Sequence, residues 1–272
     1  MCGGHGRDDL RRMGTGRPVN GLRSAVAFLT RFPVAAAGDD ATLPPEAVRW
    51  FPVVGALVGL AVAGLYAVAI LVLSPAAAAA TAVAAGVLLT GAFHEDGLAD
   101  TMDAVGGSFT REKALRILRD PRHGTFGVAA IVLSLLVRSA ALASLTASAA
   151  VALVPVAHAV SRAVAVGVVA AIPPAGEDGM GAAFGRAIGR RDLIPAFGFA
   201  LAVSLAAAGP WSAAVLGAAV AGALLAAWPA VRRLGGITGD VLGAVQQAGE
   251  IAVLVTGSAL LLQDWWSFPW WS

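Results

Sequence analysis

The chain has 272 residues, of which 58% are hydrophobic and only 13% charged, with a formal net charge of +2 and a mean hydropathy of +0.77. A soluble domain usually carries about 25% charged residues, and a single core of this size cannot bury so much apolar surface. A soluble globular domain is therefore excluded, and the composition predicts an all-α, polytopic integral membrane helical bundle. Nucleic acid is not an expected partner, because the basic residues lie in loops between apolar runs. Since Cys2 is the one cysteine, a cysteine-ligated zinc site is also excluded.

Apolar runs long enough to span a bilayer recur along the chain. A helix needs about 20 apolar residues to cross about 30 Å of hydrocarbon. On this criterion we expect about seven transmembrane helices, over residues 50–73, 76–93, 126–147, 149–171, 193–208, 211–230 and 250–263. The expected organisation is a disordered tail (1–20), one membrane-embedded domain (21–264) that opens with an amphipathic interfacial segment, and an aromatic interfacial tail (265–272).

The basic residues indicate how these helices are oriented. If the spans alternate, the lysines and arginines outside the spans all fall on one side, whereas the loops near Ser74, Ser148 and Pro210 carry none. The positive-inside rule makes the charged side cytoplasmic. This pattern predicts a multi-pass protein of the cytoplasmic (inner) membrane with a cytoplasmic N-terminus. Arg138 and Arg162 are exceptions, because both fall inside predicted spans.

The densest polar segment, residues 94–103 (HEDGLADTMD), follows the second predicted span. If the helix continues, Asp96, Asp100 and Asp103 lie at i, i+4 and i+7 and share one face. Three carboxylates on one face repel one another, and a divalent cation would offset that repulsion. Oxygen ligands without cysteine suit Mg²⁺, with Mn²⁺ as the alternative. The competing interpretation is a solvated helix end, although such ends normally mix charges of both signs.

A basic, glycine-containing segment, residues 119–127 (RDPRHGTFG), leads into the third predicted span. The guanidinium groups of Arg119 and Arg122 match phosphate oxygens, and backbone N–H groups around Thr125 at a helix start favour an anion. A cytoplasmic flank rich in arginine would look the same. The acidic segment on the same side of the membrane makes phosphate binding the preferred interpretation.

Two further polar groups enter predicted spans. Ser161 and Arg162 lie in the fourth span, where a charge usually faces the protein interior, although snorkelling to the interface is an alternative. Before the last span, Asp240 and Gln247 are seven residues apart and share a helix face, with Glu250 near its border. A glycine-rich turn capped by Asp240 is the competing interpretation.

Five motifs in order resemble the adenosylcobinamide-GDP ribazoletransferase family, also called cobalamin-5′-phosphate synthase. They are F-x-T-R-x-P at 28–33, H-x-D-G-L-A-D-T-x-D at 94–103, R-D-x-R-x-G-T-x-G at 119–127, S-R at 161–162 and G-G-x-T-G-D-x-L-G-A at 235–244. The resemblance runs from about residue 22 to residue 262. Residues 1–20 and the tryptophan-rich end lie outside it.

The resemblance implies a reaction and assigns roles. A hydroxyl of α-ribazole, or of its 5′-phosphate, attacks adenosylcobinamide-GDP; GMP leaves and adenosylcobalamin or its 5′-phosphate forms, with Mg²⁺, at the cytoplasmic face of the membrane. Asp96 and Asp100 are expected to bind Mg²⁺, and Asp103 is expected to be a third ligand or the catalytic base, with Asp100 as a second catalytic candidate. The expected substrate-binding and phosphate-binding residues are Arg119, Arg122, Thr125, Ser161, Arg162, Asp240, Gln247 and Glu250, followed by Arg31, His94 and Thr238. Expected partners are the two substrates and the bilayer; a homo-oligomer, or a complex with other late cobalamin-assembly enzymes, stays open.

Two other function classes compete with this interpretation. CDP-alcohol phosphotransferases also use aspartates on neighbouring helices, beginning D-G-x-x-A-R. Here Asp96-Gly97 is followed by Leu98-Ala99-Asp100, and the later G-x-x-x-D-x-x-x-D half is absent. A transporter is the second alternative, but the polar motifs gather on one face, and no inverted repeat is apparent.

Overall fold

The computed structural model describes residues 18–34, 43–176 and 188–264, and this part of the chain is helical without a β-strand. An isolated bridge joins Pro174 to Ile237, tying the segment after α8 to the segment before α12. The elements are α2 (Pro18–Leu29), the 3-10 helix η1 (Pro45–Trp50), α3 (Phe51–Ala69), α4 (Pro75–Thr90), α5 (Phe93–Gly106), α6 (Arg111–Ile117), α7 (Thr125–Ala143), α8 (Ala147–Ala171), α10 (Arg190–Ala208), the 3-10 helix η2 (Gly209–Trp211), α11 (Ser212–Leu234) and α12 (Gly239–Leu262).

Long apolar helices confirm the membrane class. By length and hydropathy, five segments can cross a membrane, or six if the bent pair α4–α5 is counted as one span. The five are Pro45–Ala69, Thr125–Ala143, Ala147–Ala171, Arg190–Leu234 and Gly239–Leu262. The last of these begins well before the expected start at residue 250. Helix α2 likewise begins at Pro18, inside the expected tail; residues 1–17 and 265–272 lie outside the described part of the chain.

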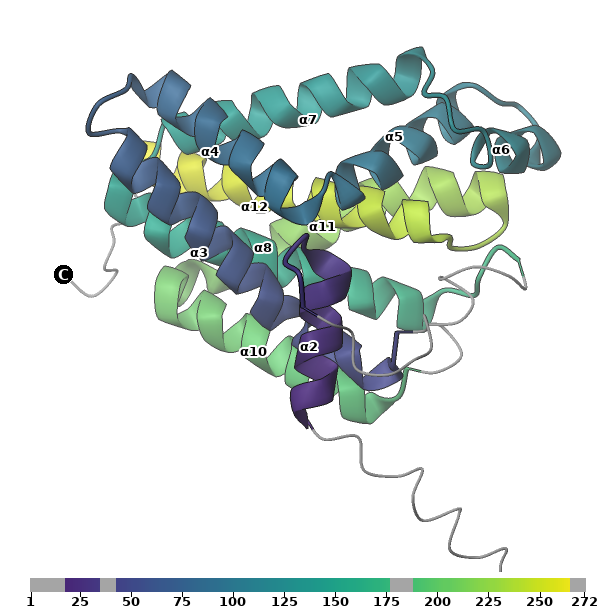
Figure 1. Ribbon diagram of the computed structural model, residues 1–272, viewed down its shortest axis with the longest axis horizontal. Coiled ribbons are helices and arrows are strands. Elements are labelled where there is room, and N and C mark those ends of the chain that lie inside the picture. The colour runs from purple at the N-terminus through teal and green to yellow at the C-terminus, as the bar shows by residue number, and fades with distance from the viewer. Residues whose placement is uncertain (1–17, 35–42, 177–187, 265–272) are drawn as a thin grey trace, which may run out of the picture.

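The acidic segment does not continue the helix of the second span but forms a helix of its own, on which Asp96, Asp100 and Asp103 all lie. Helix α4 ends at Thr90, and α5 begins at Phe93 after a bend of 90°, so the two form a V beneath α7 (Figure 1). Gly91 and Ala92 make the break, with φ of 67° and 57°. Glycine adopts this left-handed conformation readily, and it does so here as the residue that ends α4. The bend sends the acidic segment along α7 and α12.

Helix α8 lies at the centre of the bundle and packs against α3, α10, α11 and α12. The Thr146 side chain caps its N-terminus by accepting a hydrogen bond from the Ala149 N–H at 3.2 Å. Glycines bring α3 very close: a Cβ on Gly55 would lie 2.5 Å from the carbonyl oxygen of His158. Small residues that allow such close approach are typical of membrane helix packing.

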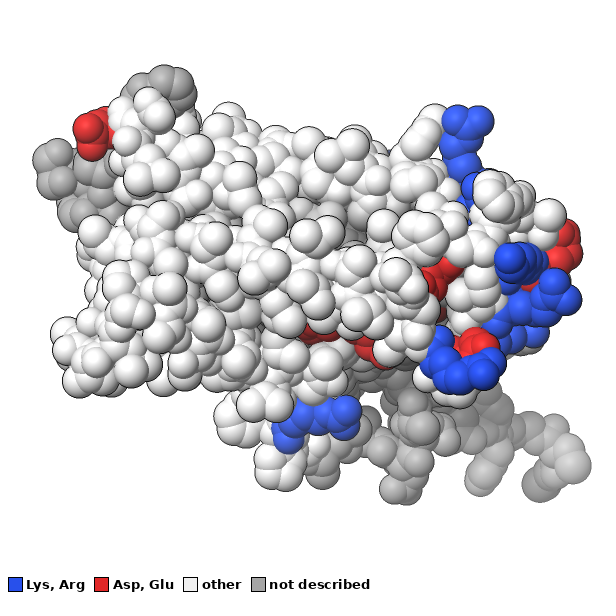
Figure 2. Space-filling model, turned by 90° about the horizontal axis from the view of Figure 1, so that it is seen from above, with Lys and Arg blue, Asp and Glu red and all other residues white. Residues whose placement is uncertain are grey.

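Charge is distributed unevenly over the surface. Figure 2 shows most of the lysine and arginine side chains toward one end of the molecule, with further charged groups along one edge and one acidic group at the opposite end, while the rest of this face is uncharged. Many leucines and valines of the described helices are exposed, among them Leu71, Leu88, Leu133 and Leu225. This is the surface expected of a protein whose body faces lipid and whose polar end faces water.

Candidate active site

Helix α5 is held against α12 by the close approach of two backbones. A Cβ on Gly97 would lie 2.8 Å from the carbonyl oxygen of Asp240 and 3.1 Å from its Cα atom. On the opposite side of the contact, a Cβ on Gly243 would lie 3.1 Å from the Cα atom of Gly97. Glycine at both positions therefore brings the carboxylates of α5 next to Asp240 at the start of α12.

Asp96 and Asp100 form a carboxylate pair with a histidine between them. The Nδ1 atom of His123 lies 3.2 Å from Oδ1 of Asp100, and its Nε2 atom lies 3.6 Å from Oδ1 of Asp96. The side chain of Asp96 is 63% exposed and that of Asp100 is 18% exposed. The negative charges of Asp96 and Asp240 both act on Asp100. Three carboxylates thus share one water-accessible region, as the sequence predicted for two of them.

The donor set suits Mg²⁺ better than a metal held by protein alone. Within the described residues, no group of three or more His, Cys, Asp or Glu side chains is arranged so that it could hold a metal ion. Mg²⁺ typically binds through one or two carboxylates and keeps several waters and substrate phosphates as its other ligands. Asp96 and Asp100, with exposed or partly exposed oxygens, match that requirement.

Asp103 makes a different set of contacts from the other two aspartates of α5. Its Oδ2 atom accepts a hydrogen bond from the Gly124 N–H at 2.6 Å, and its Oδ1 atom accepts one from the Gly127 N–H at 2.9 Å. The carboxylate is buried and satisfies backbone donors at the start of α7. Asp103 therefore fixes the 119–127 segment to α5, and each of its carboxylate oxygens is occupied by one of these hydrogen bonds.

The basic residues of the 119–127 segment are exposed. Arg122 binds Asp120 through two side-chain hydrogen bonds, of 2.9 Å and 2.8 Å, and its own side chain is 85% exposed. Hydrogen bonds from the side chain and backbone of Arg122 lower the pKa of Asp120 to about 2. Arg119 and Thr125 are exposed as well, with Thr125 opening α7. These groups are available to an anionic ligand that approaches from water.

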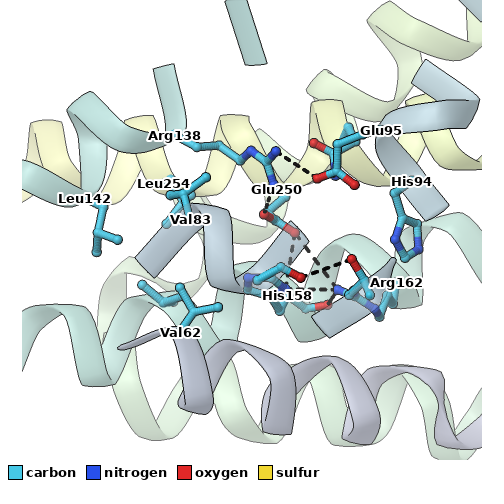
Figure 3. Close-up of a pocket in the computed structure, with 14 residues that line it drawn as sticks. Val62, Val83, His94, Glu95, Arg138, Leu142, His158, Arg162, Glu250 and Leu254 are labelled. Atoms are coloured by element: carbon cyan, nitrogen blue, oxygen red, sulfur yellow. Dashed lines mark hydrogen bonds and ion pairs between the residues drawn. The ribbon is translucent and has the colours of Figure 1, made fainter. Parts of the chain in front are cut away.

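Behind the carboxylates lies a buried ionic cluster, drawn in Figure 3. Arg138 of α7 is its centre, because NH2 lies 2.8 Å from Oε1 of Glu95 and NH1 lies 3.3 Å from Oε1 of Glu250. The other oxygen of Glu250 is 3.3 Å from Nδ1 of His158 and 3.9 Å from NH1 of Arg162. Two carboxylates and two guanidinium groups balance in charge, as burial between membrane helices requires.

Amide and hydroxyl side chains complete this cluster. Gln247 donates to Glu95 at 3.2 Å and accepts from Ser134 at 3.0 Å. Gln246 donates to Glu250 at 2.7 Å and to Ser161 at 3.1 Å. The structure therefore brings Ser161, Gln247 and Glu250 together, although in the interior and not at the water-accessible carboxylates.

Three atoms of the cluster keep unused hydrogen-bonding capacity. Oε2 of Glu95, Nε of Arg138 and Nε of Arg162 are buried and have no hydrogen-bond partner among the described residues. A polar cavity lies among these side chains, and the centre of a water molecule can move in about 30 Å³ of it. That space is sufficient for water, which would satisfy buried polar atoms of this kind.

The remaining predicted residues have separate positions. Arg31 lines a surface hollow together with Asp96 and Gly91. Thr238 caps α12 by accepting from the Val241 N–H at 3.3 Å, and it donates to Asp240 at 3.4 Å. His94 is buried and lines the polar cavity and an adjoining apolar one.

Sequence reasoning did not place Glu95, Arg138 and His123 in the site. Each left a signal: Glu95 and His123 belong to the polar segments at 94–103 and 119–127, and Arg138 is a charge inside a predicted span. Their partners come from other helices, which no local pattern specifies. The arginine inside a span was an indication of a buried acidic partner.

Comparison with known proteins gives the family of this chain. The family model described as cobalamin-5-phosphate synthase matches residues 21–258. The chain belongs to this family. It is 43% identical to a protein of Bradyrhizobium diazoefficiens named adenosylcobinamide-GDP ribazoletransferase, over 88% of this chain and 93% of the relative. A protein of the same name from Ralstonia nicotianae is 43% identical over 85% and 91%, and one from Chlorobium phaeobacteroides is 38% identical over 90% and 99%.

No solved structure gives a significant match. The family model covers most of α2 and almost all of α12, and the matched range includes the residues that line both cavities and the carboxylate pair. Membership in the cobalamin-5-phosphate synthase family therefore concerns the whole membrane domain. It agrees with the resemblance carried by the five sequence motifs.

Proposed function

We propose that this protein joins adenosylcobinamide-GDP to α-ribazole, or to α-ribazole 5′-phosphate, and releases GMP. The observation that carries the proposal is the pair Asp96 and Asp100, partly open to water, with Asp240 beside it and an exposed basic segment next to it. A diphosphate-linked donor is anionic, so its transfer depends on positioning and on charge neutralisation. The names of the similar proteins specify the donor and the ribazole acceptor.

Asp96 and Asp100 would hold Mg²⁺ at this site. When bound there, the ion supplies positive charge against the diphosphate oxygens as the bond to phosphorus breaks. Arg119 and Arg122 lie at the exposed edge and would bind phosphate oxygens. Arg162 belongs to the buried cluster, so its part in the reaction is to hold Glu250 and the helices that carry the site.

The transfer step needs a group that accepts one proton. The acceptor hydroxyl oxygen forms a bond to the cobinamide-side phosphorus, the bond from that phosphorus to the GMP oxygen breaks, and the hydroxyl proton passes to a carboxylate. Asp103 already accepts two backbone hydrogen bonds. The carboxylates that could accept the proton are therefore Asp100 and Asp240. Asp240 belongs to α12 and faces the Asp96–Asp100 pair of α5.

The charged end of the molecule would face the cytoplasm. We also propose that α10 and α11 cross the membrane separately, which with the α4–α5 pair gives seven crossings. A straight helix over the 45 residues of Arg190–Leu234 would be about 67 Å long, more than twice the thickness of the hydrocarbon. Gly209, with φ of 51° and ψ of −121°, provides the break.

The deciding experiment uses detergent-purified protein with adenosylcobinamide-GDP, α-ribazole and Mg²⁺. We expect GMP and a cobalamin product in equal amounts, both lost on chelation and restored by added Mg²⁺. At a Mg²⁺ concentration that just saturates the wild type, the variant Asp96→Asn should lose most of its turnover, whereas Glu112→Gln, which removes an exposed carboxylate from α6, should retain it. A folded protein that makes no GMP with either acceptor, but releases CMP from CDP-diacylglycerol and an alcohol, would instead be a CDP-alcohol phosphotransferase.

A further inference from the structure

His94 also lines a second cavity. It is enclosed by α2, η1, α3, α5, α8 and α12, and its walls include Phe28, Phe51, Phe93, Val166, Val169 and Leu242. The centre of a water molecule can move in about 70 Å³ of it, and its empty volume with the mouth included is about 590 Å³. The cavity is thus an apolar pocket with aromatic walls, the type of site that takes a planar ring.

The aromatic side chains are arranged as a group. The rings of Phe28 and Phe51 stack with centroids 5.6 Å apart, and Phe93 meets Phe28 edge-on at 5.0 Å. Apolar walls of this kind favour a ligand with few polar edge atoms, because each buried polar atom without a partner costs free energy.

One end of the pocket is polar and has unmatched hydrogen-bonding capacity. His94, Arg162 and Gln246 line it. The imidazole of His94 is only 6% exposed and makes no hydrogen bond with another described residue, and Nε of Arg162 is buried without a partner. A buried imidazole of this kind is expected to find a partner, and a ligand in the pocket would provide one.

This pocket adjoins the proposed reaction site. Gly239 lines it, and the next residue is Asp240. His94 lines it from α5, two residues before Asp96. A ligand whose ring occupied the pocket would therefore lie beside the start of α12, which carries Asp240.

We propose that this pocket binds the heteroaromatic base of the acceptor nucleoside and directs its ribosyl group toward Asp240. The inference rests on the proposed function. The base of ribazole is a fused aromatic ring with one unsubstituted ring nitrogen, a single acceptor that the His94 N–H can satisfy. The guanine of the donor carries several donors and acceptors on its edges, which these walls would leave unpaired.

The test uses a substitution that narrows the pocket and leaves Asp96, Asp100 and Asp240 unchanged. Ala165 of α8 lines it, and Ala165→Leu adds three carbon atoms there. Ala170→Leu makes the same change on the same helix at an exposed position. Binding of α-ribazole to each purified protein is measured by equilibrium dialysis without donor, and KM is measured for both substrates.

We expect Ala165→Leu to weaken α-ribazole binding about tenfold or more and to raise its KM equally, because a misfit of a few methylene groups in an apolar pocket has effects of this size. The KM for the donor should be unchanged, and Ala170→Leu should match the wild type. His94→Phe keeps the bulk of the ring but removes the N–H, and it should also weaken α-ribazole binding.

The two proposals fail in different ways. GMP release by wild type, with α-ribazole affinity unchanged in both Ala165→Leu and His94→Phe, would overturn the pocket assignment alone. A raised KM for the donor and not for the acceptor would also overturn it, because the pocket would then belong to the donor. If wild type released no GMP while binding α-ribazole in a way that Ala165→Leu weakens, the proposed reaction would fail and the pocket assignment would stand.

Discussion

Arg138 of α7 and Glu95 of α5 form a buried ion pair of 2.8 Å, directly behind the exposed carboxylate of Asp96. The two residues are 43 positions apart in the sequence. Since Glu95 and Asp96 are neighbours, the pair holds the inner side of α5 while the outer side presents its carboxylates to water. Arg138 also contacts Glu250, so one guanidinium group connects α5, α7 and α12.

Replacing this arginine should destabilise the bundle strongly. Arg138→Met leaves Glu95 and Glu250 as buried carboxylates without their cation, and we expect the free energy of unfolding to fall by about 3–5 kcal/mol. Unfolding in detergent, followed by tryptophan fluorescence, measures this. Val137→Met is the matched control, because Val137 is exposed on the same helix.

A second substitution separates charge from packing in the same cluster. Adding Glu95→Gln to Arg138→Met removes one of the uncompensated carboxylates and should recover part of the lost stability. If Arg138→Met were as stable as Val137→Met, the ion pair would not be what fastens α5 to α7.

Asp103 should behave as a structural acid. Asp103→Ala removes the acceptor for the Gly124 and Gly127 N–H groups, which should lower the free energy of unfolding by about 1–3 kcal/mol. The Mg²⁺ concentration needed for half-maximal activity should stay unchanged, whereas Asp96→Asn should raise it. Titrating Mg²⁺ against activity for both variants distinguishes these roles; an equal rise in the two would make Asp103 a ligand, as the sequence alone suggested.

The contact between α5 and α12 should tolerate no added methyl group. In Gly97→Ala the new Cβ would meet backbone atoms of Asp240 at 2.8 Å, which cannot rotate away as a side chain could. We expect a loss of about 1–3 kcal/mol in stability and a lower kcat, because the carboxylates separate. Gly217→Ala, also within a helix but with open space around it, should be neutral or slightly stabilising. If Gly97→Ala and Gly217→Ala changed stability equally, close packing of α5 against α12 would not be the cause of the loss.

The orientation can be read from cysteine accessibility. In a Cys2→Ser background, Arg119→Cys and Ser148→Cys place single thiols at exposed positions toward opposite ends of the predicted topology. A membrane-impermeant maleimide applied to intact spheroplasts should label the cysteine at position 148 and not the one at 119, with the reverse in inside-out vesicles. Labelling of the cysteine at position 119 in intact spheroplasts would show that the protein has the opposite orientation.

Much of this site followed from local sequence. Hydropathy identified the membrane helices, and helical spacing put Asp96 and Asp100 on one face, because the angle between residues of a helix is fixed by its geometry. The five ordered motifs identified the family before any fold was known. The sequence also placed a charge, Arg138, inside a span, where a buried partner was to be expected.

Only the tertiary structure decided which groups meet. The left-handed backbone at Gly91 and Ala92 turns α5 by 90°, a direction that neither the apolar run before the bend nor the acidic segment after it dictates. Asp103 shares the helix face of Asp96, yet its oxygens are taken by the start of α7, because periodicity gives a direction but not the element that packs there. The pairing of Glu95 with Arg138 depends in the same way on two helices brought together by the fold.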